Sequence, residues 1–557
     1  MILKSISKPS MTPTSALERF LHWEKEIPNN VFLRQPFGDE WKTWTYKQAG
    51  DEIKRIAQAI KNLRFPTGTK IALLSKNCAH WIMADLAIMM NGHISVPLYA
   101  TLTAKSIQEI LEHSESKAVI IGKLDHYEEQ KQGIPDSILR IGIELYGIKE
   151  SNSWENYVKK ESPISEFHTW KKEDLLTIIY TSGTTGNPKG VMHNVQAFDT
   201  TVQTAMADLN IKLHPKLFSF LPLSHIAERM GVEILGVYQG GDFAFSESLE
   251  LFPKNLEATQ PDIFFAVPRL WAKFQEKILI QLPQKKLNLL LSIPIVNSII
   301  RKKIKTKLGL SKARHVHTGA APISVDMLEW FEKLGVSIYQ AYGMTEDCVY
   351  SHFNREGANK HGTVGQRLNG VQVKIAEDGE IRLKSTGNMM GYYKEPQMTA
   401  DSFDEENFLK TGDRGEIDDE GYLKITGRAK DNFKTDKGKY VAPAAIETKL
   451  LVNSDIEQVC VVGMGIPQPI ALVILSAYAS KKPKDEIIKS LTASLDATNA
   501  TLENYEKLAK AVIMKEEWTI ENGLMTPKLS VKRYAVEKIH LPKYPQWFEK
   551  PGKVIWE

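Results

Sequence analysis

The sequence has few cysteines, no long apolar run and almost no net charge, and each of these absences excludes a class of protein. The three cysteines, Cys78, Cys348 and Cys460, lie far apart and match neither a disulfide framework nor a metal-ligand spacing. A net charge of +4 gives no argument for a nucleic-acid partner. No stretch approaches the roughly 18 apolar residues of a membrane-spanning helix, and the N-terminal segment lacks the apolar core of a secretory signal. We therefore expect a cytoplasmic protein, with peripheral contact at the inner face of the membrane left open.

Length and pattern predict an α/β protein of more than one domain. A chain of 557 residues exceeds the size at which a single core stops growing. From about residue 42, amphipathic helical segments alternate with short β-branched runs, as in SIQEILEHSESKAVIIG. Strand alternation surrounds a Glu-Asp-Gly turn after residue 370, and helix and strand mix again after residue 428. We expect a large multi-layered N-terminal domain over residues 1–427, with a β-rich subdomain at about 365–427, and a small α+β C-terminal domain over residues 428–557.

The strongest chemical signal is the segment from Tyr180 to Gly190, YTSGTTGNPKG, which follows the apolar run LLTII. Its glycines allow the backbone to approach a ligand, its hydroxyls donate hydrogen bonds and Lys189 supplies positive charge, so the composition predicts a phosphate-binding loop. A Gly/Thr-rich turn without a ligand is the structural alternative. The Walker A spacing fails, because Pro188 stands five residues after Gly183 and Gly190 follows Lys189. The kinase and P-loop NTPase classes are therefore disfavoured.

This segment resembles the phosphate loop of the adenylate-forming superfamily of acyl-CoA synthetases, luciferases and nonribosomal adenylation domains. Further motifs similar to those of the family follow in the family's order: LPLSHIAER at 221–229, TGAAPI at 318–323, QAYGMTE at 340–346, TGD at 411–413, GRAK at 427–430 and KGKYVAP at 437–443. The Glu-Arg pair that ends the first of these motifs is typical of long-chain acyl-CoA synthetases, and the last motif resembles that of bacterial long-chain enzymes.

The resemblance implies roles for individual residues. Nucleotide binding is implied for Thr181, Ser182, Gly183, Thr184, Thr185, Gly186, Lys189, Gly319, Ala320, Ala321, Tyr342, Gly343, Met344, Thr345, Asp413 and Arg428. Within this set, the resemblance implies that Tyr342 stacks on adenine and that Asp413 and Arg428 contact the ribose or phosphate. The resemblance also implies that Thr184 and Glu346 bind Mg²⁺. It places His225 beside the acyl pocket, although a histidine that follows a strand equally suits a structural role.

In this family the C-terminal domain rotates between two half-reactions, which implies a hinge at Lys430 or Asp431. The resemblance places coenzyme A against Gly438, Lys439 and Tyr440. The adenylation lysine has two candidates. The segment TPKLSVKR at 526–533 has serine where relatives carry the first lysine, which leaves Lys532, in the family register, and Lys528.

The implied reaction has two steps: a carboxylate attacks the α-phosphate of ATP and releases pyrophosphate, and a thiol then attacks the acyl-adenylate and releases AMP. ATP, Mg²⁺, a fatty acid and coenzyme A are the expected ligands, and the expected state is a monomer or homodimer. Two alternatives stay open: an acyl-AMP ligase that delivers to a carrier protein, and a catalytically silent regulator that binds ATP or acyl-AMP.

Residues 277–312 combine apolar stretches with six basic residues between Arg301 and Lys312. This composition suits binding to the surface of an anionic membrane. It equally suits two amphipathic helices packed on the domain with a solvated basic face.

Overall fold

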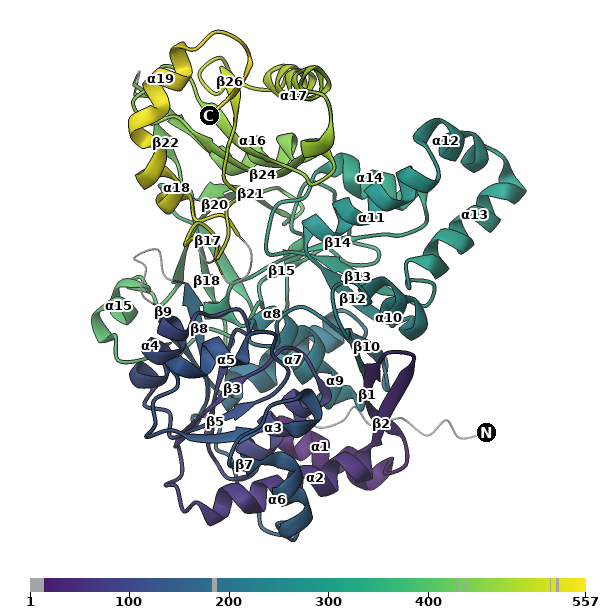
Figure 1. Cartoon of the computed structure of the whole chain (residues 1–557), viewed down its shortest axis with the longest axis vertical. Helices are drawn as coiled ribbons and strands as arrows, with labels where there is room; N and C mark the ends of the chain where they lie inside the picture. Colours follow the sequence, from purple (N-terminus) through teal and green to yellow (C-terminus); the bar gives the residue numbers. More distant parts are fainter. Residues whose placement is uncertain (1–14, 183–187, 429–430, 437, 521, 527–529) are drawn as a thin grey trace.

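The computed structural model describes residues 15–182, 188–428, 431–436, 438–520, 522–526 and 530–557. Two large sheets make up most of the N-terminal part (Figure 1). Within the described residues the first has eight strands in the order β19-β9-β8-β4-β3-β5-β6-β7, and the second has nine in the order β16-β15-β14-β13-β12-β10-β11-β1-β2. The central strands of both sheets are parallel, and the antiparallel pairs lie toward the edges.

The strands of the first sheet are β3 (Lys70–Leu74), β4 (Ile94–Leu98), β5 (Ala118–Ile121), β6 (Leu139–Gly142), β7 (Asn152–Ser153), β8 (Leu175–Ser182), β9 (Pro188–Asn194) and β19 (Gly391–Tyr392). Those of the second are β1 (Val31–Phe37), β2 (Glu40–Thr45), β10 (Lys216–Ser219), β11 (Asp242–Phe245), β12 (Ile263–Ala266), β13 (His315–Thr318), β14 (Tyr339–Tyr342), β15 (His352–Phe353) and β16 (Gln366–Arg367).

Helix α3 (Ala79–Met90) joins the two sheets into one core. Its sequence is apolar on nearly every side, and all of its residues are buried. It connects β3 to β4 of the first sheet and also contacts β1 of the second. A helix with an apolar surface all round is stable only where other elements cover it on all sides, which explains the position of α3 between the sheets.

Shorter amphipathic helices cover the outer faces. Helix α2 (Tyr46–Asn62) begins at a capping box formed by Thr45 and Gln48, and it buries Ile53, Ile56 and Ile60 on one face. The other helices of this part are α1 (Ala16–Glu26), α4 (Ala104–Ser114), α5 (Tyr127–Gln130), α6 (Trp154–Lys160), α7 (Val195–Asp208), α8 (Ile226–Glu228), α9 (Leu235–Gln239), α10 (Phe252–Thr259), α11 (Pro268–Gln281), α12 (Gln284–Ser292), α13 (Pro294–Lys307), α14 (Val325–Lys333) and α15 (Pro396–Asp401).

A separate antiparallel sheet follows, with the order β17-β18-β20-β21. Its strands are β17 (Gln372–Ile375), β18 (Glu380–Lys384), β20 (Leu409–Ile417) and β21 (Leu423–Arg428). The first hairpin turns at Gly379, whose φ of 83° is unfavourable for other residues. This sheet carries residues from the TGD and GRAK motifs on adjacent strands.

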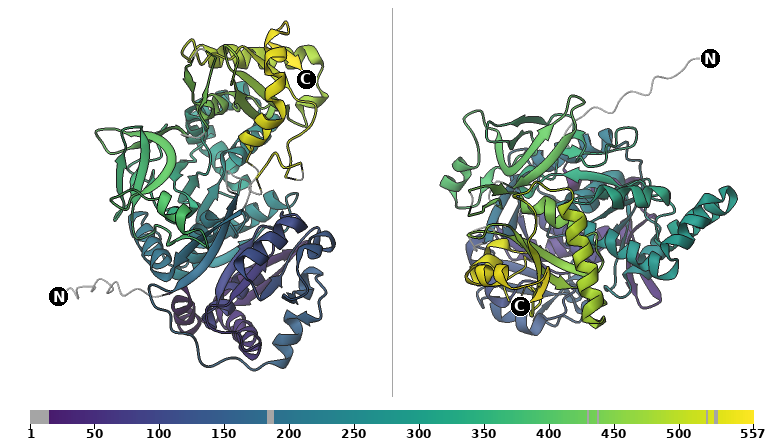
Figure 2. Two further views of the ribbon diagram at one scale, coloured as in Figure 1. Left: turned by 90° about the vertical axis from the view of Figure 1, so that its left-hand side faces the viewer. Right: turned by 90° about the horizontal axis from the view of Figure 1, so that it is seen from above.

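The C-terminal part lies at one end of the molecule (Figure 2). It has a short hairpin of β22 (Phe433–Lys434) and β23 (Tyr440–Val441), followed by a sheet of β24 (Ile456–Val462), β25 (Ile470–Leu475), β26 (Lys510–Ile513) and β27 (Val554–Trp556). Helices α16 (Pro443–Leu450) and α17 (Lys484–Asn499) cover one face, and α18 (Arg533–His540) and α19 (Tyr544–Glu549) cover the other. The α/β class with a large N-terminal and a smaller C-terminal part is confirmed.

The two parts touch at specific points. Helix α16 contacts β21, and Arg269 of α11 forms an ion pair with Glu457 of β24. In the part of the chain that the structure describes, no helix has the length and apolar character needed to cross a membrane.

Candidate active site

The strands that flank the predicted phosphate loop form an antiparallel pair. Thr181 of β8 lies opposite Lys189 of β9, and Tyr180 lies opposite Gly190. A side chain at Gly190 would come within 2.7 Å of Ile178, so glycine permits this close pairing. The predicted loop residues Gly183, Thr184, Thr185 and Gly186 lie outside the described residues, as does the side chain of Ser182.

Lys189 and Glu346, predicted from two separate motifs, both contact Tyr392. The Lys189 ammonium lies 5.6 Å from the centre of the Tyr392 ring. The Tyr392 hydroxyl donates a hydrogen bond to Glu346 Oε1 at 2.8 Å. Burial and the neighbouring Glu346 carboxylate raise the pKa of Tyr392, so it stays a neutral donor. Tyr392 was not predicted as a site residue, and the only signal for it is its place in the Gly-Tyr-Tyr segment on β19.

Three further predicted residues form a second cluster. The Tyr342 hydroxyl donates to Asp413 Oδ2 at 2.8 Å, and Arg428 Nε donates to Asp413 Oδ1 at 2.9 Å. Burial, and then the Asp413 charge, raise the pKa of Tyr342. The Asp413 charge also raises the pKa of Arg428. The Asp413 carboxylate is thus buried between a phenol and a guanidinium, and the Arg428 side chain beside it is exposed to solvent.

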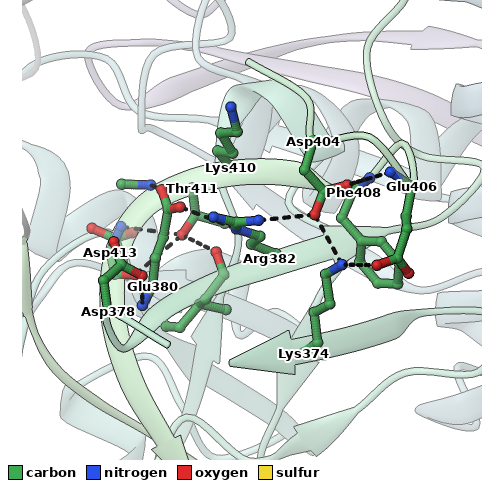
Figure 3. A network of polar contacts seen from close by, with 12 residues as sticks. Lys374, Asp378, Glu380, Arg382, Asp404, Glu406, Phe408, Lys410, Thr411 and Asp413 are labelled. Carbon is green, nitrogen blue, oxygen red and sulfur yellow. Dashed lines mark hydrogen bonds and ion pairs between the residues drawn. The ribbon is translucent and has the colours of Figure 1, made fainter. Parts of the chain in front are cut away.

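A polar network on β18 and β20 fixes the stretch of β20 that carries Asp413 (Figure 3). Glu380 accepts a hydrogen bond from the Gly412 backbone at 3.0 Å, and Thr411 Oγ1 donates to the Ile381 carbonyl at 2.7 Å. Thr411 Oγ1 also accepts from the Asp413 backbone at 3.1 Å. Arg382 bridges Glu380 and Asp404 in the same network.

The TGAAPI segment lies at the carboxyl end of β13, beside the end of the parallel strand β14 that carries Tyr342. A side chain at Gly319 would stand 2.9 Å from the Ala341 carbonyl, so glycine is required by close packing. Ala320 has a φ of 64° and is exposed together with Ala321. Small, exposed residues at the carboxyl ends of parallel strands leave space for a ligand there.

The YGMTE segment is hydrogen-bonded to a buried histidine, His193, that was not predicted from the sequence. His193 Nε2 lies 2.7 Å from the Thr345 carbonyl and therefore carries the proton. Burial lowers the pKa of His193 to about 4, so the ring is neutral. Gly343 is tightly packed, since a side chain there would lie 2.5 Å from Val349, while Met344 donates its backbone N–H to Asp347 at 2.8 Å.

His225 begins α8, where its Nδ1 accepts a hydrogen bond from the Ala227 backbone at 3.1 Å. Glu228 and Arg229, three and four residues further along the same motif, are fully buried. Glu228 Oε1 accepts from Ser219 Oγ at 2.9 Å, and burial raises the pKa of this carboxyl to about 8. The Glu-Arg end of this motif therefore lies in the interior.

Lys532 directly precedes α18, and its interactions within the described chain stay in the C-terminal part, for example from its backbone N–H to the Leu524 carbonyl. The structure therefore does not bring it to Asp413, and Lys528 lies outside the described residues. The next residue, Arg533, donates to Glu447 at 2.5 Å and so anchors the loop to α16.

Gly438, Lys439 and Tyr440 lie on the β22–β23 hairpin, where Gly438 has a φ of 75° and Tyr440 is 63% exposed. Of the two hinge candidates, Lys430 lies outside the described residues. Asp431 donates its backbone N–H to the Arg428 carbonyl at 3.3 Å.

The fold is a layered α/β architecture with a smaller C-terminal part. A model of the AMP-binding enzyme family matches residues 20–393, and a model of the AMP-binding enzyme C-terminal domain matches residues 431–543. The chain belongs to the AMP-binding enzyme family, and the family resemblance expected from the motifs is confirmed.

Curated relatives match nearly the whole chain. Long-chain-fatty-acid–CoA ligase ACSBG2 of Xenopus laevis is 25% identical over 98% of this chain and 85% of its own length. Long-chain-fatty-acid–CoA ligase 5 of Rattus norvegicus is 28% identical over 91% of this chain and 84% of its own length. Long-chain-fatty-acid–CoA ligase FadD15 of Mycobacterium tuberculosis is 25% identical over 92% and 93%.

Solved structures share the fold. The adenylation domain of a carboxylate reductase from Mycobacterium chelonae superposes with a TM-score of 0.81 at 20% identity, over 98% of this chain and 92% of that one. The anthranilate CoA ligase AuaEII, solved with anthranoyl-AMP, gives a TM-score of 0.77 at 20% identity, over 96% and 98%.

Proposed function

We propose that this protein activates a long-chain fatty acid with ATP and transfers the acyl group to coenzyme A. The observation that carries the proposal is the meeting of Tyr342, Asp413 and Arg428 beside the small residues at the ends of β13 and β14. An aromatic ring suits adenine, and a carboxylate can accept from two vicinal hydroxyls of a ribose. The names of the curated relatives and the LPLSHIAER motif support the choice of acid.

In the first half-reaction a carboxylate oxygen of the acid bonds to the α-phosphorus, and the bond from that phosphorus to the pyrophosphate oxygen breaks. In the second, the sulfur of coenzyme A bonds to the acyl carbon, AMP leaves and the thiol proton passes to solvent. Neither step needs a protein nucleophile, so the chain's residues act by positioning and by stabilising negative charge. We propose that Lys189 stabilises the negative charge on the phosphates and that Asp413, together with Arg428, binds the ribose.

Glu346 suits a magnesium ion, because it offers carboxylate oxygens, the ligands that Mg²⁺ prefers. The Tyr392 hydroxyl holds one of these oxygens at 2.8 Å and so orients the carboxylate. We propose that Glu346 holds Mg²⁺ together with Thr184, which would neutralise charge on the triphosphate.

We assign adenylation to Lys532, with Lys528 as the alternative, and coenzyme A binding to the hairpin of Gly438, Lys439 and Tyr440. We propose Asp431 or Lys430 as the hinge, His225 as a wall of the acyl pocket, and a division of the chain near residue 428. A cytoplasmic monomer or homodimer fits this reaction, since ATP and coenzyme A are both available there.

Pyrophosphate release across short, medium, long and aromatic acids, with and without coenzyme A, tests the proposal. We expect the highest kcat/KM with long-chain acids and multiple turnovers only with coenzyme A. Turnover with an acylated carrier protein as the product, and none with coenzyme A, would favour the acyl-AMP ligase. No pyrophosphate with any acid would favour the silent regulator.

A further inference from the structure

Helices α12 and α13 form a hairpin that projects from the body of the molecule. Figure 1 shows the turn between them at the far end of this projection, and Figure 2 shows the same projection from above. The hairpin is held in a defined orientation. Trp330 of α14 donates to Gln284 at 2.8 Å, Arg301 donates to the Lys333 carbonyl at 2.9 Å and Asn297 closes the turn by donating to the Leu291 carbonyl at 2.8 Å.

The far end of the hairpin exposes large aliphatic side chains. Leu289, Ile293, Ile295 and Ile299 are 64%, 44%, 78% and 60% exposed. Ile295 and Ile299 stand one helical turn apart on the same face of α13, a helix in which no residue is buried. Two amphipathic helices packed on the domain would instead cover these side chains. Several exposed aliphatic side chains at the end of a projecting element indicate an interaction site.

Exposed lysines follow this aliphatic end on the same face. Lys302 and Lys303 continue the face of Ile295 and Ile299 one turn further along α13. Lys303 lies eight residues after Ile295, which is about 12 Å along a helix. Aliphatic groups buried about 5–10 Å deep at a lipid surface would therefore place these ammonium groups near the phosphates.

The charge of the segment is of one sign. Residues 277–312 include nine lysines and arginines and no aspartate or glutamate. Without these nine, the 71 basic residues of the chain would number fewer than its 67 acidic ones, so the net positive charge of the protein depends on this segment. One of the nine, Lys307, is paired with Glu257 at 2.8 Å.

The side-chain types distinguish a lipid from a protein partner. The segment has no Phe, Trp or Tyr, and eight of its nine basic residues are lysines. Protein interfaces are enriched in aromatic residues and arginine and depleted in lysine. Isoleucine and leucine beside lysines instead match the acyl chains and phosphates of an anionic bilayer. We infer that the α12–α13 hairpin docks the protein on an anionic membrane, with Leu289, Ile293, Ile295 and Ile299 inserted and Lys302 and Lys303 against lipid phosphates.

Flotation of the full chain with vesicles tests this inference without ATP, acid or coenzyme A. Phosphatidylcholine vesicles with about 30% phosphatidylglycerol should bind the protein, and pure phosphatidylcholine vesicles should bind it at least ~10-fold less. Raising the salt from about 0.05 M to about 0.5 M should weaken binding by a similar factor, since the Debye length shortens. Equal binding to both vesicles would overturn the inference.

Two double variants separate the contributions. Ile295→Ser with Ile299→Ser should lower vesicle binding at least ~10-fold, and Lys302→Glu with Lys303→Glu should remove the preference for anionic vesicles. Matched controls are Leu249→Ser with Val452→Ser, which alter exposed apolar side chains elsewhere, and Lys105→Glu with Lys160→Glu, which alter exposed lysines. Wild-type binding by the hairpin variants, or equal losses in the controls, would contradict the docking surface.

Two further measurements keep the interpretation clear. Pyrophosphate release with a water-soluble short acid should be the same in the wild type and the hairpin variants, so a docking defect is distinguishable from failure of the proposed reaction. Light scattering should give one unchanged mass for all of them. A dimer that Ile295→Ser with Ile299→Ser dissociates, without vesicle binding by the wild type, would assign the surface to a second copy and overturn the membrane inference.

Discussion

The Arg229 guanidinium lies 2.7 Å from Asp85 Oδ2, and both side chains are fully buried between the two large sheets. Arg229 also donates to Ser95 of β4 at 2.8 Å and to Thr177 of β8 at 2.6 Å. Aromatic rings also stabilise the guanidinium, since the ring centres of Trp81 and Phe198 lie 5.7 and 5.5 Å from its central carbon. Arg229 thus ties the strand that leads into the predicted phosphate loop to α3.

Arg229→Met should lower the thermal stability strongly, because it leaves the Asp85 carboxylate buried without its cation. Breaking a buried pair by removing one partner typically costs about 3–5 kcal/mol. The control is Lys424→Met, which breaks a solvent-exposed pair with Glu416 and should leave the melting temperature nearly unchanged. Similar melting temperatures for both variants would contradict a structural role for Arg229.

Stability should also respond to pH through Glu228. Burial raises its pKa to about 8, well above the ordinary value of 4.5. Between these pH values the folded protein therefore keeps a proton on Glu228 that the unfolded chain has lost. This contribution is complete below about pH 4.5 and is lost as the pH rises toward 8. Glu228→Gln removes the titration. The melting temperature of the variant, relative to the wild type, should therefore be higher at pH 8 than at pH 5.5, and a constant difference would show that Glu228 is ionised in the fold.

Asp413→Asn should raise the KM for ATP and lower kcat/KM about 10–100-fold, since charge-assisted hydrogen bonds contribute roughly 1.5–3 kcal/mol each. Asp418→Asn is the matched control, because Asp418 directly follows β20, pairs with Lys360 and has no assigned contact with a substrate. Steady-state pyrophosphate release at varied ATP measures both. An unchanged KM in Asp413→Asn would exclude ribose binding by this carboxylate.

Tyr392→Phe should raise the concentration of Mg²⁺ needed for half-maximal rate, because it frees the Glu346 carboxylate. Loss of a residue that orients a metal ligand typically costs about 10–100-fold in metal affinity or activity. Tyr393→Phe is a neighbouring control that breaks an exposed hydrogen bond from Tyr393 to Glu115. If both variants respond to Mg²⁺ as the wild type does, Tyr392 does not position a metal ligand.

Lys532→Ala should abolish acyl-adenylate formation while leaving thioester formation from added acyl-adenylate largely intact. Lys528→Ala should have the smaller effect on the first step, and Lys538→Ala, on α18, serves as the control. The two half-reactions are measured separately, with pyrophosphate exchange for the first. Near-normal rates of both half-reactions in Lys532→Ala and Lys528→Ala would remove both lysines from the mechanism.

The sequence predicted the layered α/β fold and identified Tyr342, Asp413 and Arg428, which the structure brings together. Tyr342 and Arg428 end the strands β14 and β21, and Asp413 lies opposite Arg428 on β20, so the motifs that carry them meet in the fold. Motif order could not predict Tyr392, since its contact with Glu346 depends on β19 pairing with β9, two segments about 200 residues apart. The burial of Arg229 was equally hidden, because its partners come from α3, β4 and β8, and only the packed core brings these elements together.

The most direct test of the account identifies the products of one reaction mixture that contains ATP, Mg²⁺, a long-chain fatty acid and coenzyme A. Mass spectrometry should find acyl-CoA, AMP and pyrophosphate in equal amounts, and acyl-adenylate on the protein when coenzyme A is left out. ADP with inorganic phosphate in place of AMP with pyrophosphate, or AMP without a thioester, would contradict the central claim.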